Sequence, residues 1–162
     1  MRTHTIYLAL LLLALTTTIQ AQTRPLKIYI SSDMEGVVGA VTGEQLGPQG
    51  FEYARFREFM TQEVNAAIEA AFAAGATEIV VSDSHGNGQN LLIEKLPKNI
   101  LLVRAWPRPL MMMQGIDETF AGAIFLGYHT ATTNSQGVRA HTISSARLAD
   151  VRLKGVSVIS DN

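Results

Sequence analysis

Short apolar runs and one long amphipathic stretch set the order of elements along this chain. Residues 26–30 are rich in β-branched and aromatic side chains and have the length of a strand. From residue 51 to residue 72, apolar residues recur at spacings of three and four, which predicts an amphipathic helix of about 20 residues. This pattern stops at Gly75, a residue suited to the left-handed position just past a helix end. A second apolar run at 77–81 predicts the next strand.

The order strand, helix, strand favours parallel pairing, because the crossover is long enough to bring the chain back to the same edge. Near-continuous apolar character in both strands is typical of a sheet that is covered on both faces. Two further strands are predicted at 100–103 and 121–126, and a short helix at 89–96 that ends at Pro97. The predicted fold class is therefore α/β: a three-layer open sheet, mostly parallel, with helices on both faces.

The connecting segments carry their own signals. Residues 31–50 hold too many glycines for a regular element, and a loop of that length in a compact domain tends to be functional. The methionines at 111–113 are interpreted as core or subunit interface rather than substrate pocket. Residues 141–146 are predicted to be extended, and 151–158 alternate around Lys154-Gly155 as a hairpin does.

The N-terminus has the pattern of an export signal. Arg2 precedes an apolar core at 6–15, and a Thr-rich stretch follows that ends at Ala21. The apolar core is about ten residues long, well short of the roughly 20 that span a bilayer. Residues 1–21 are therefore expected to be cleaved, which leaves 22–162 as one domain of an exported, periplasmic or secreted protein without a membrane anchor.

The composition of the chain excludes several kinds of partner and site. With a formal net charge of −1 and no basic stripe, the chain is not expected to bind nucleic acid. It contains no cysteine, which excludes disulfides, thiolate catalysis and Cys-based zinc sites. A catalytic or metal site must therefore be built from other side chains.

Carboxylates and histidines follow three of the predicted strands. Asp33 and Glu35 come after the first, Asp83 and His85 after the second, and His129 after the strand at 121–126. In an open parallel sheet the carboxyl ends of the strands lie at one edge, where ligands bind. Imidazole and carboxylate without thiolate suit zinc, or another divalent ion such as manganese. A shared carboxylate would allow two ions about 3.5–4 Å apart.

Each of these residues also has an ordinary interpretation. Asp33 suits a turn or a cap, and His129 suits a core or strand-end position. Residues 84–88 suit a simple turn or a weak phosphate-binding loop. His141 follows a flexible loop and is a candidate ligand, general acid or base, or exposed loop residue. The pattern alone also allows a dinuclear metal phosphoesterase.

Five ordered motifs resemble one known family, the D-aminopeptidases related to DppA, which are zinc peptidases. These motifs lie at residues 33–36, 83–85, 115–120, 125–129 and 137–141. The resemblance runs from Lys27 to about Val158, nearly all of the chain beyond the predicted signal, and corresponds to the N-terminal half of the family.

The resemblance implies two zinc ions per subunit. Asp33 matches the ligand shared by both ions, Glu35 and His129 match ligands of one ion, and His85 matches a ligand of the other. His141 matches the catalytic histidine. The family acts on short peptides with an N-terminal D-residue, notably D-alanine, and assembles as a ring-shaped homo-oligomer, so the same activity and assembly are expected here.

The chain departs from the family at its end. Family members are much longer and supply a further zinc-binding glutamate soon after the stretch that matches residues 156–158. In this sequence Asp161 lies close enough to that position to substitute for it. The chain is therefore expected to be truncated relative to the family, and the alternative hypothesis is a catalytically inactive remnant that binds metal or peptide.

Overall fold

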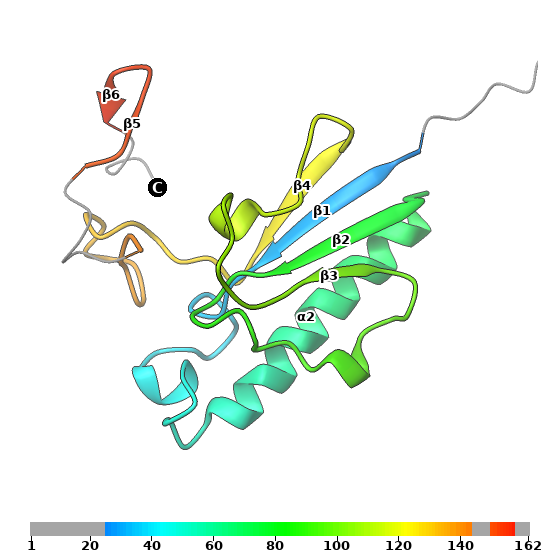
Figure 1. The fold of residues 1–162 in the computed structure, drawn as a ribbon. Helices are drawn as coiled ribbons and strands as arrows, with labels where there is room; N and C mark the ends of the chain where they lie inside the picture. Colours follow the sequence, from blue (N-terminus) through cyan, green and yellow to red (C-terminus); the bar gives the residue numbers. More distant parts are fainter. Residues whose placement is uncertain (1–24, 144–149, 158–162) are drawn as a thin grey trace, which may run out of the picture.

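The structure, a computed structural model, describes residues 25–143 and 150–157. Its centre is a four-stranded sheet in the order β3-β2-β1-β4 (Figure 1). The strands are β1 (Lys27–Ser32), β2 (Glu78–Asp83), β3 (Leu101–Val103) and β4 (Gly122–Leu126). All three pairings are parallel, so the predicted α/β fold with an open parallel sheet is confirmed.

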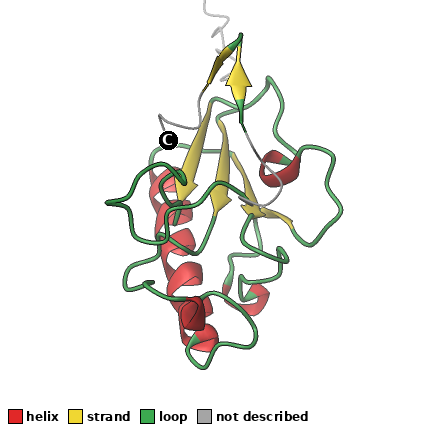
Figure 2. Cartoon of the chain, turned by 90° about the vertical axis from the view of Figure 1, so that its left-hand side faces the viewer, coloured by secondary structure: helices red, strands yellow, loops and turns green. Residues whose placement is uncertain are grey.

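One long helix, α2 (Tyr53–Ala73), covers one face of this sheet (Figure 2). It buries Phe56, Met60, Val64 and Ile68. These side chains form one apolar cluster with strand residues that include Ile30, Ile79 and Val81. This is the face that the three- and four-residue spacing predicts. Just after the helix, Gly75 has a φ of +97°, the left-handed conformation that glycine adopts most readily.

The other face of the sheet is polar at its centre. Tyr29 Oη donates hydrogen bonds to the carbonyl oxygens of Met112 and Gln114, at 3.1 and 2.8 Å. The helical cover here, within the described residues, is the 3-10 turn η3 (Met111–Met113). None of these three methionines is buried, so a core position for them is wrong, while a subunit-interface role stays a prediction. Met111 and Met112 line the cavity at the metal centre that is described below.

The segment after β2 differs from the predicted helix at 89–96, and only the 3-10 turn η2 (Ile93–Lys95) forms there. The backbone N–H groups of Asn90 and Leu91 donate to the carboxylate of Asp83, at 2.5 and 2.8 Å. The next amide, that of Leu92, donates to Thr61 Oγ1. These bonds tie the segment to β2 and α2, and Leu92 is left with an extended backbone (φ −83°, ψ 96°), which interrupts a helix at this point.

The remaining elements are short. A 3-10 turn, η1 (Gly43–Gln45), interrupts the predicted long loop after β1. The predicted hairpin is confirmed as β5 (Arg152–Leu153) paired antiparallel with β6 (Val156–Ser157). The predicted signal at 1–21 and residues 144–146 of the predicted extended segment lie outside the described residues, and residues 141–143 form no strand. None of the helices in the described ranges has the length and apolar character that crossing a membrane requires.

Candidate metal centre

The register of the sheet brings three strand ends to one place. Ser32, at the end of β1, pairs with Asp83 of β2 on one side and Leu126 of β4 on the other. The ladder continues past these ends, because Asp33 N donates to Leu126 O and Ser84 N donates to Ser32 O, both at 2.8 Å. The side chains that follow each strand are therefore held at one edge, as the sequence predicts.

Two glycines allow the loops after β1 and β4 to touch. Gly36 N donates to Gly127 O at 2.7 Å. A Cβ atom on Gly36 would lie 2.3 Å from Tyr128 O, and one on Gly127 would lie 2.2 Å from Asp33 O. Gly127 also has a φ of +64°. Only residues without a side chain permit this approach, which sets Asp33 and Glu35 beside the segment that carries His129.

The first cluster, which we call the strand-end group, consists of Asp33, Glu35 and His85. His85 Nδ1 lies 3.0 Å from Asp33 Oδ1 and 2.9 Å from Glu35 Oε2. The three residues are buried, with 2%, 8% and 6% of their surface exposed. Their ligand atoms all lie within 4.8 Å of one another, a spacing that could hold a metal ion.

The pKa shifts in this group reflect two buried carboxylates that share one protonated histidine. Burial opposes the charge on His85, but its hydrogen bonds to Asp33 and Glu35 outweigh burial and raise the His85 pKa to about 10. Burial likewise opposes the charge on Glu35, yet the bonds from His85 and Asp33 lower the Glu35 pKa to about 2. For Asp33, burial is the largest influence and raises the pKa, and the nearby Glu35 adds to it. A metal ion binds neutral imidazole, so it would take the place of the His85 proton between the two carboxylates.

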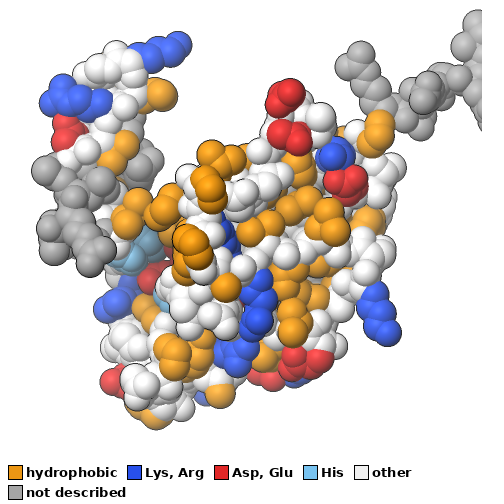
Figure 3. Space-filling view, in the orientation of Figure 1, with side chains coloured by type: hydrophobic (Ala, Val, Ile, Leu, Met, Phe, Trp, Pro, Cys, Tyr) orange, Lys and Arg blue, Asp and Glu red, His pale blue; other side chains and the backbone are white. Residues whose placement is uncertain are grey.

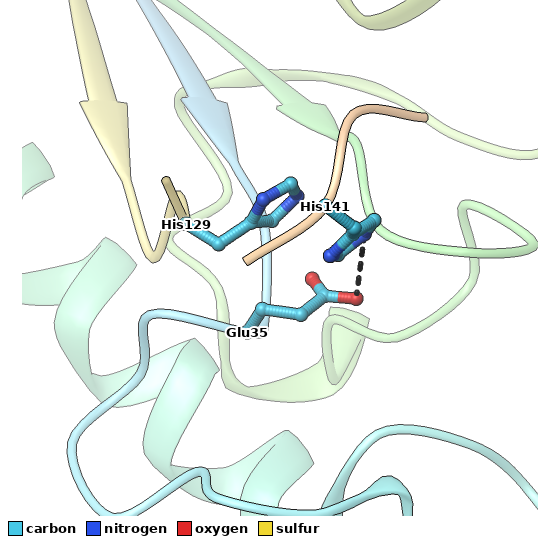
Figure 4. Close-up of side chains that lie close together, drawn as sticks. All are labelled: Glu35, His129 and His141. Atoms are coloured by element: carbon cyan, nitrogen blue, oxygen red, sulfur yellow. Dashed lines mark ion pairs between the residues drawn. The ribbon is translucent and has the colours of Figure 1, made fainter. Parts of the chain in front are cut away.

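The second cluster consists of Glu35, His129 and His141 (Figure 4). His141 Nε2 lies 3.8 Å from Glu35 Oε1, and the two imidazole rings stack with centroids 3.6 Å apart and 15° between their planes. His129 Nε2 lies 3.6 Å from Asp33 Oδ2, which links this cluster to the strand-end group. Glu35 belongs to both clusters.

In each histidine, one ring nitrogen bonds to a backbone carbonyl oxygen, and the other faces the carboxylates of Asp33 and Glu35. His85 Nε2 bonds to Leu46 O at 2.6 Å, His129 Nδ1 to Thr130 O at 3.0 Å, and His141 Nδ1 to Arg139 O at 2.7 Å. A carbonyl only accepts, so these nitrogens carry the proton and the opposite nitrogens are free to act as ligands. Such carbonyl partners commonly orient metal-binding histidines, and the donor set fits zinc.

All five predicted site residues, Asp33, Glu35, His85, His129 and His141, thus come together. The division of ligands between two ions stays a prediction: Glu35 is common to both clusters, whereas the resemblance implies Asp33 as the shared ligand. His141 lies close enough to Glu35 for both to bind one ion. Its role as ligand or catalytic group also stays a prediction. Asp83, by contrast, faces away from the centre and binds the amides of Asn90 and Leu91.

Two residues that support the centre carry no clear signal in the sequence. Trp106 Nε1 donates to Gly86 O at 2.8 Å, just after His85. Arg108, 7% exposed, donates to Asp83 O at 2.8 Å, just before it. They therefore hold the backbone on both sides of His85. Trp106 and Arg108 lie far from His85 along the chain, and nothing in their local pattern indicates this contact.

A cavity of about 890 Å³ opens in front of both clusters and is lined by all five of these acidic and histidine residues. In Figure 3 the histidines lie between the main body and the segment that carries β5 and β6, with apolar side chains beside them. The volume is within the range of about 300–1,000 Å³ that is usual for small-molecule sites. The arrangement can hold a divalent cation at the edge of a space large enough for a short peptide.

Comparison with known proteins finds similarity to one enzyme family. Residues 26–159 match the profile of the Peptidase_M55 family, described as D-aminopeptidase. A D-aminopeptidase of Bacillus subtilis (strain 168) is 41% identical over 118 residues, which are 73% of this chain and 43% of the relative. A solved structure, the Zn-dependent D-aminopeptidase DppA from Bacillus subtilis, a self-compartmentalizing protease, superposes with a TM-score of 0.77 at 36% identity. The match covers 83% of this chain and 48% of that one, so the chain spans less than half the length of either relative.

Proposed function

We propose a function from the premise that this chain belongs to the D-aminopeptidase family, whose profile matches residues 26–159. The proposed activity is zinc-dependent hydrolysis of short peptides that begin with a D-amino acid, D-alanine in particular. The observation that carries the proposal is the convergence of two carboxylates and three histidines in two overlapping clusters. Because the chain spans less than half of its relatives, their activity and substrates enter here as proposals.

The proposed cofactor is zinc, two ions per subunit. Asp33, Glu35 and His85 would hold one, and Glu35, His129 and His141 surround the position for the other. Bound zinc would supply a Lewis acid for the peptide carbonyl and lower the pKa of a water molecule. The carbonyl partners of His85 and His129 support this proposal, since they leave one ring nitrogen of each free for a metal, and His141 is assigned to proton transfer instead.

The chain's own residues would handle the substrate and the protons. The cavity that Asp33 and Glu35 line would place the start of the peptide beside the zinc ions. His141 has 34% of its side chain exposed to the cavity, against 8% for His85, so it is the histidine best able to exchange protons with a bound peptide. We propose that it passes a proton to the leaving amine through Nε2.

The proposal is tested by zinc analysis of the purified chain together with hydrolysis of D-Ala-D-Ala. Asp33→Asn should abolish both zinc binding and hydrolysis, because a buried ligand is lost from the first cluster. The matched control is Asp117→Asn, whose exposed carboxylate accepts a hydrogen bond from Thr119 N and does not line the cavity.

Three outcomes distinguish the peptidase from the two alternative hypotheses. Zinc-dependent hydrolysis that Asp33→Asn removes and Asp117→Asn leaves intact supports a peptidase. Stoichiometric zinc without hydrolysis of any D-alanyl peptide supports a non-catalytic metal-binding chain. Turnover of a phosphoester in place of the peptide, measured in parallel, supports a phosphoesterase.

Export and assembly complete the proposal. The charged start, apolar core and Ala21 of residues 1–21 support export to the periplasm or the medium, and N-terminal sequencing of the secreted chain should begin at Gln22. The self-compartmentalizing character of the Bacillus structure supports a homo-oligomer, which light scattering at several protein concentrations would detect. A monomer at all concentrations, or a retained N-terminus, would contradict these two points.

A further inference from the structure

Large apolar side chains are exposed around the cavity in front of the metal centre. Met111 is 50% exposed, Phe125 54%, Ile143 63% and Val151 37%, and all four line the cavity. Apolar side chains that gather at a concave site, rather than scatter singly over a surface, commonly mark a place where a ligand binds. Figure 3 shows hydrophobic side chains, in orange, beside the histidines.

The backbone holds two of these side chains in a strained conformation. Met111 has a φ of +51° and Ile143 a φ of +47°. Positive φ is an outlier for bulky and β-branched residues, and residues held in it tend to cluster at functional sites. Both line the cavity, Met111 from η3 and Ile143 from the segment after His141.

The wall between them is fixed by contacts that do not involve a ligand. Trp106 is bonded through Nε1 to Gly86 O, and the Arg108 guanidinium lies 4.5 Å from its ring centroid. The Phe125 ring meets Tyr128 edge to face at 5.3 Å. A wall of aromatic and apolar groups with few remaining degrees of freedom binds an apolar group with little loss of conformational entropy.

Charge around the cavity is confined to one end. The described residues that line it include Asp33, Glu35 and three histidines at the metal centre, and no lysine or arginine. In the proposed function this end holds the zinc ions. The remaining wall offers no partner for a charged side chain, whose burial without a partner would be unfavourable.

We propose that Trp106, Met111, Phe125 and Ile143 form an apolar subsite, and that it takes the side chain of the peptide residue that follows the cleaved bond. This rests on the proposed aminopeptidase function. An aminopeptidase removes one residue, and the side chain of D-alanine is a single methyl group, so the rest of a cavity of about 890 Å³ is left for the next residue. The subsite makes the enzyme selective for apolar residues at that position.

The chain contains a single tryptophan, so the fluorescence of Trp106 reports occupancy of this subsite. We would mix the full zinc-loaded chain with D-Ala-D-Leu-amide or D-Ala-D-Asn-amide in a stopped-flow instrument and fit the fluorescence change before hydrolysis. The two side chains have similar shape, and the amide removes the terminal carboxylate. The leucine peptide should bind about tenfold more tightly or better, as burial of a leucine side chain predicts.

Two variants test whether the preference for leucine over asparagine arises at this subsite. Met111→Gln replaces an apolar side chain of the subsite with a polar one of similar length, and it should reduce the Leu-to-Asn preference by about threefold or more. Leu110→Gln is the matched control, since Leu110 immediately precedes Met111, is 55% exposed and does not line the cavity. Circular dichroism of both variants confirms that they are folded, and the comparison of the two peptides on the unaltered chain stands without them.

The outcomes separate this inference from the proposed function. Equal affinity for the two peptides, or equal loss of preference in Met111→Gln and Leu110→Gln, overturns the subsite even if both peptides are hydrolysed. A clear preference for the leucine peptide with no hydrolysis supports the subsite as a binding site and overturns the peptidase.

Discussion

The metal centre is built from two regions that are held in different ways. The strand-end group (Asp33, Glu35, His85) follows β1 and β2, is buried, and is bonded from several sides: His85 alone contacts two carboxylates and Leu46 O. The second region, which we call the C-terminal segment, comprises the described residues 130–143 and 150–157 and supplies His141. That histidine is joined to the backbone by His141 N to Thr130 O and by its Nδ1 to Arg139 O, and 34% of its side chain is exposed.

The difference follows from packing. The sheet and α2 enclose one apolar cluster, and the loops that carry the strand-end group continue its hydrogen-bonded ladders. In the described part of the C-terminal segment, Ala131 is the only buried residue, while Val138, Leu153 and Val156 are each more than half exposed. Figure 1 draws this segment beyond the carboxyl ends of the strands, away from the sheet and α2. Few buried contacts mean a low free energy of local opening.

This contrast suggests a division of labour. Ligands that must hold a metal ion in one geometry lie where the sheet fixes the backbone before any ion binds. A group that must meet a substrate and exchange protons lies on a segment that can move. Four substitutions test this division, beginning with the largest expected effect.

His85→Gln should remove zinc and hydrolysis together. Zinc sites gain about 10–16 kcal/mol from their ligands, so loss of one ligand should weaken zinc binding by about 1,000-fold or more. The change also leaves two buried carboxylates without a cation between them. Competition against a chromophoric chelator measures the affinity. Zinc binding within tenfold of the unaltered chain would contradict the assignment of His85 as a ligand.

His141→Gln should separate metal binding from catalysis. Removal of a general acid or base lowers turnover by about 100-fold or more, while the strand-end group keeps its zinc. The pH profile of hydrolysis should also lose the limb that reports this histidine, a change that a purely structural role would not produce. If zinc affinity falls as far as in His85→Gln, His141 is a ligand and the division between the two regions is wrong.

Gly127→Ala should break the contact between the loops after β1 and β4. Its Cβ would lie 2.2 Å from Asp33 O at a φ of +64°, so the backbone must shift, and we expect a loss of about 2 kcal/mol in the free energy of unfolding. Gly122→Ala is the matched control, because a Cβ at Gly122 meets nothing within 4 Å. Urea unfolding measures both variants. An equal effect of the two would show that the close approach does not stabilise the centre.

Arg152→Ala should have the smallest effect. Arg152 is in the hairpin, 64% of its side chain is exposed, and it pairs with Asp150 at 2.5 Å. Exposed ion pairs contribute little to stability, so zinc affinity should stay within about twofold of the unaltered chain. Chelator competition under the same conditions as for His85→Gln gives the comparison. A loss of tenfold or more would mean that the hairpin supports the metal ligands directly.

Local patterns in the sequence predict most of the fold. The helix from residue 51 and its end before Gly75 follow from the three- and four-residue spacing, and the four strands follow from apolar runs. β1 and β2 extend two residues beyond their predicted ends, into Ser31-Ser32 and Ser82-Asp83. These polar residues are buried because they bond across the sheet, as Ser31 Oγ does to Ser84 Oγ at 2.7 Å. An apolar run cannot report strand residues whose burial depends on a partner far along the chain.

Asp33, Glu35, His85 and His129 could be predicted to lie together because parallel strands end at a common edge. His141 follows no strand, and its place in the site was implied only by the family resemblance. Their pairing could not be predicted in the same way. The Glu35 position between two clusters depends on how the loop after β1 turns against Gly127, and the free nitrogen of His85 depends on Leu46 O. The failed helix at 89–96 also depends on distant segments, because side chains of β2 and α2 hold its backbone and Leu92 is left extended.

By itself, the sequence determined the elements, the edge where the chemistry lies and the kinds of ligand available there, because periodicity and strand-end position are local properties of the chain. Only the tertiary structure decided which nitrogen of each histidine is free, which carboxylate lies between the clusters, and that apolar side chains surround the cavity. Those features arise from contacts between segments that are distant along the chain, such as His85 with Leu46 and His141 with Glu35. Residue spacing carries no record of such contacts, which form only when the segments pack together.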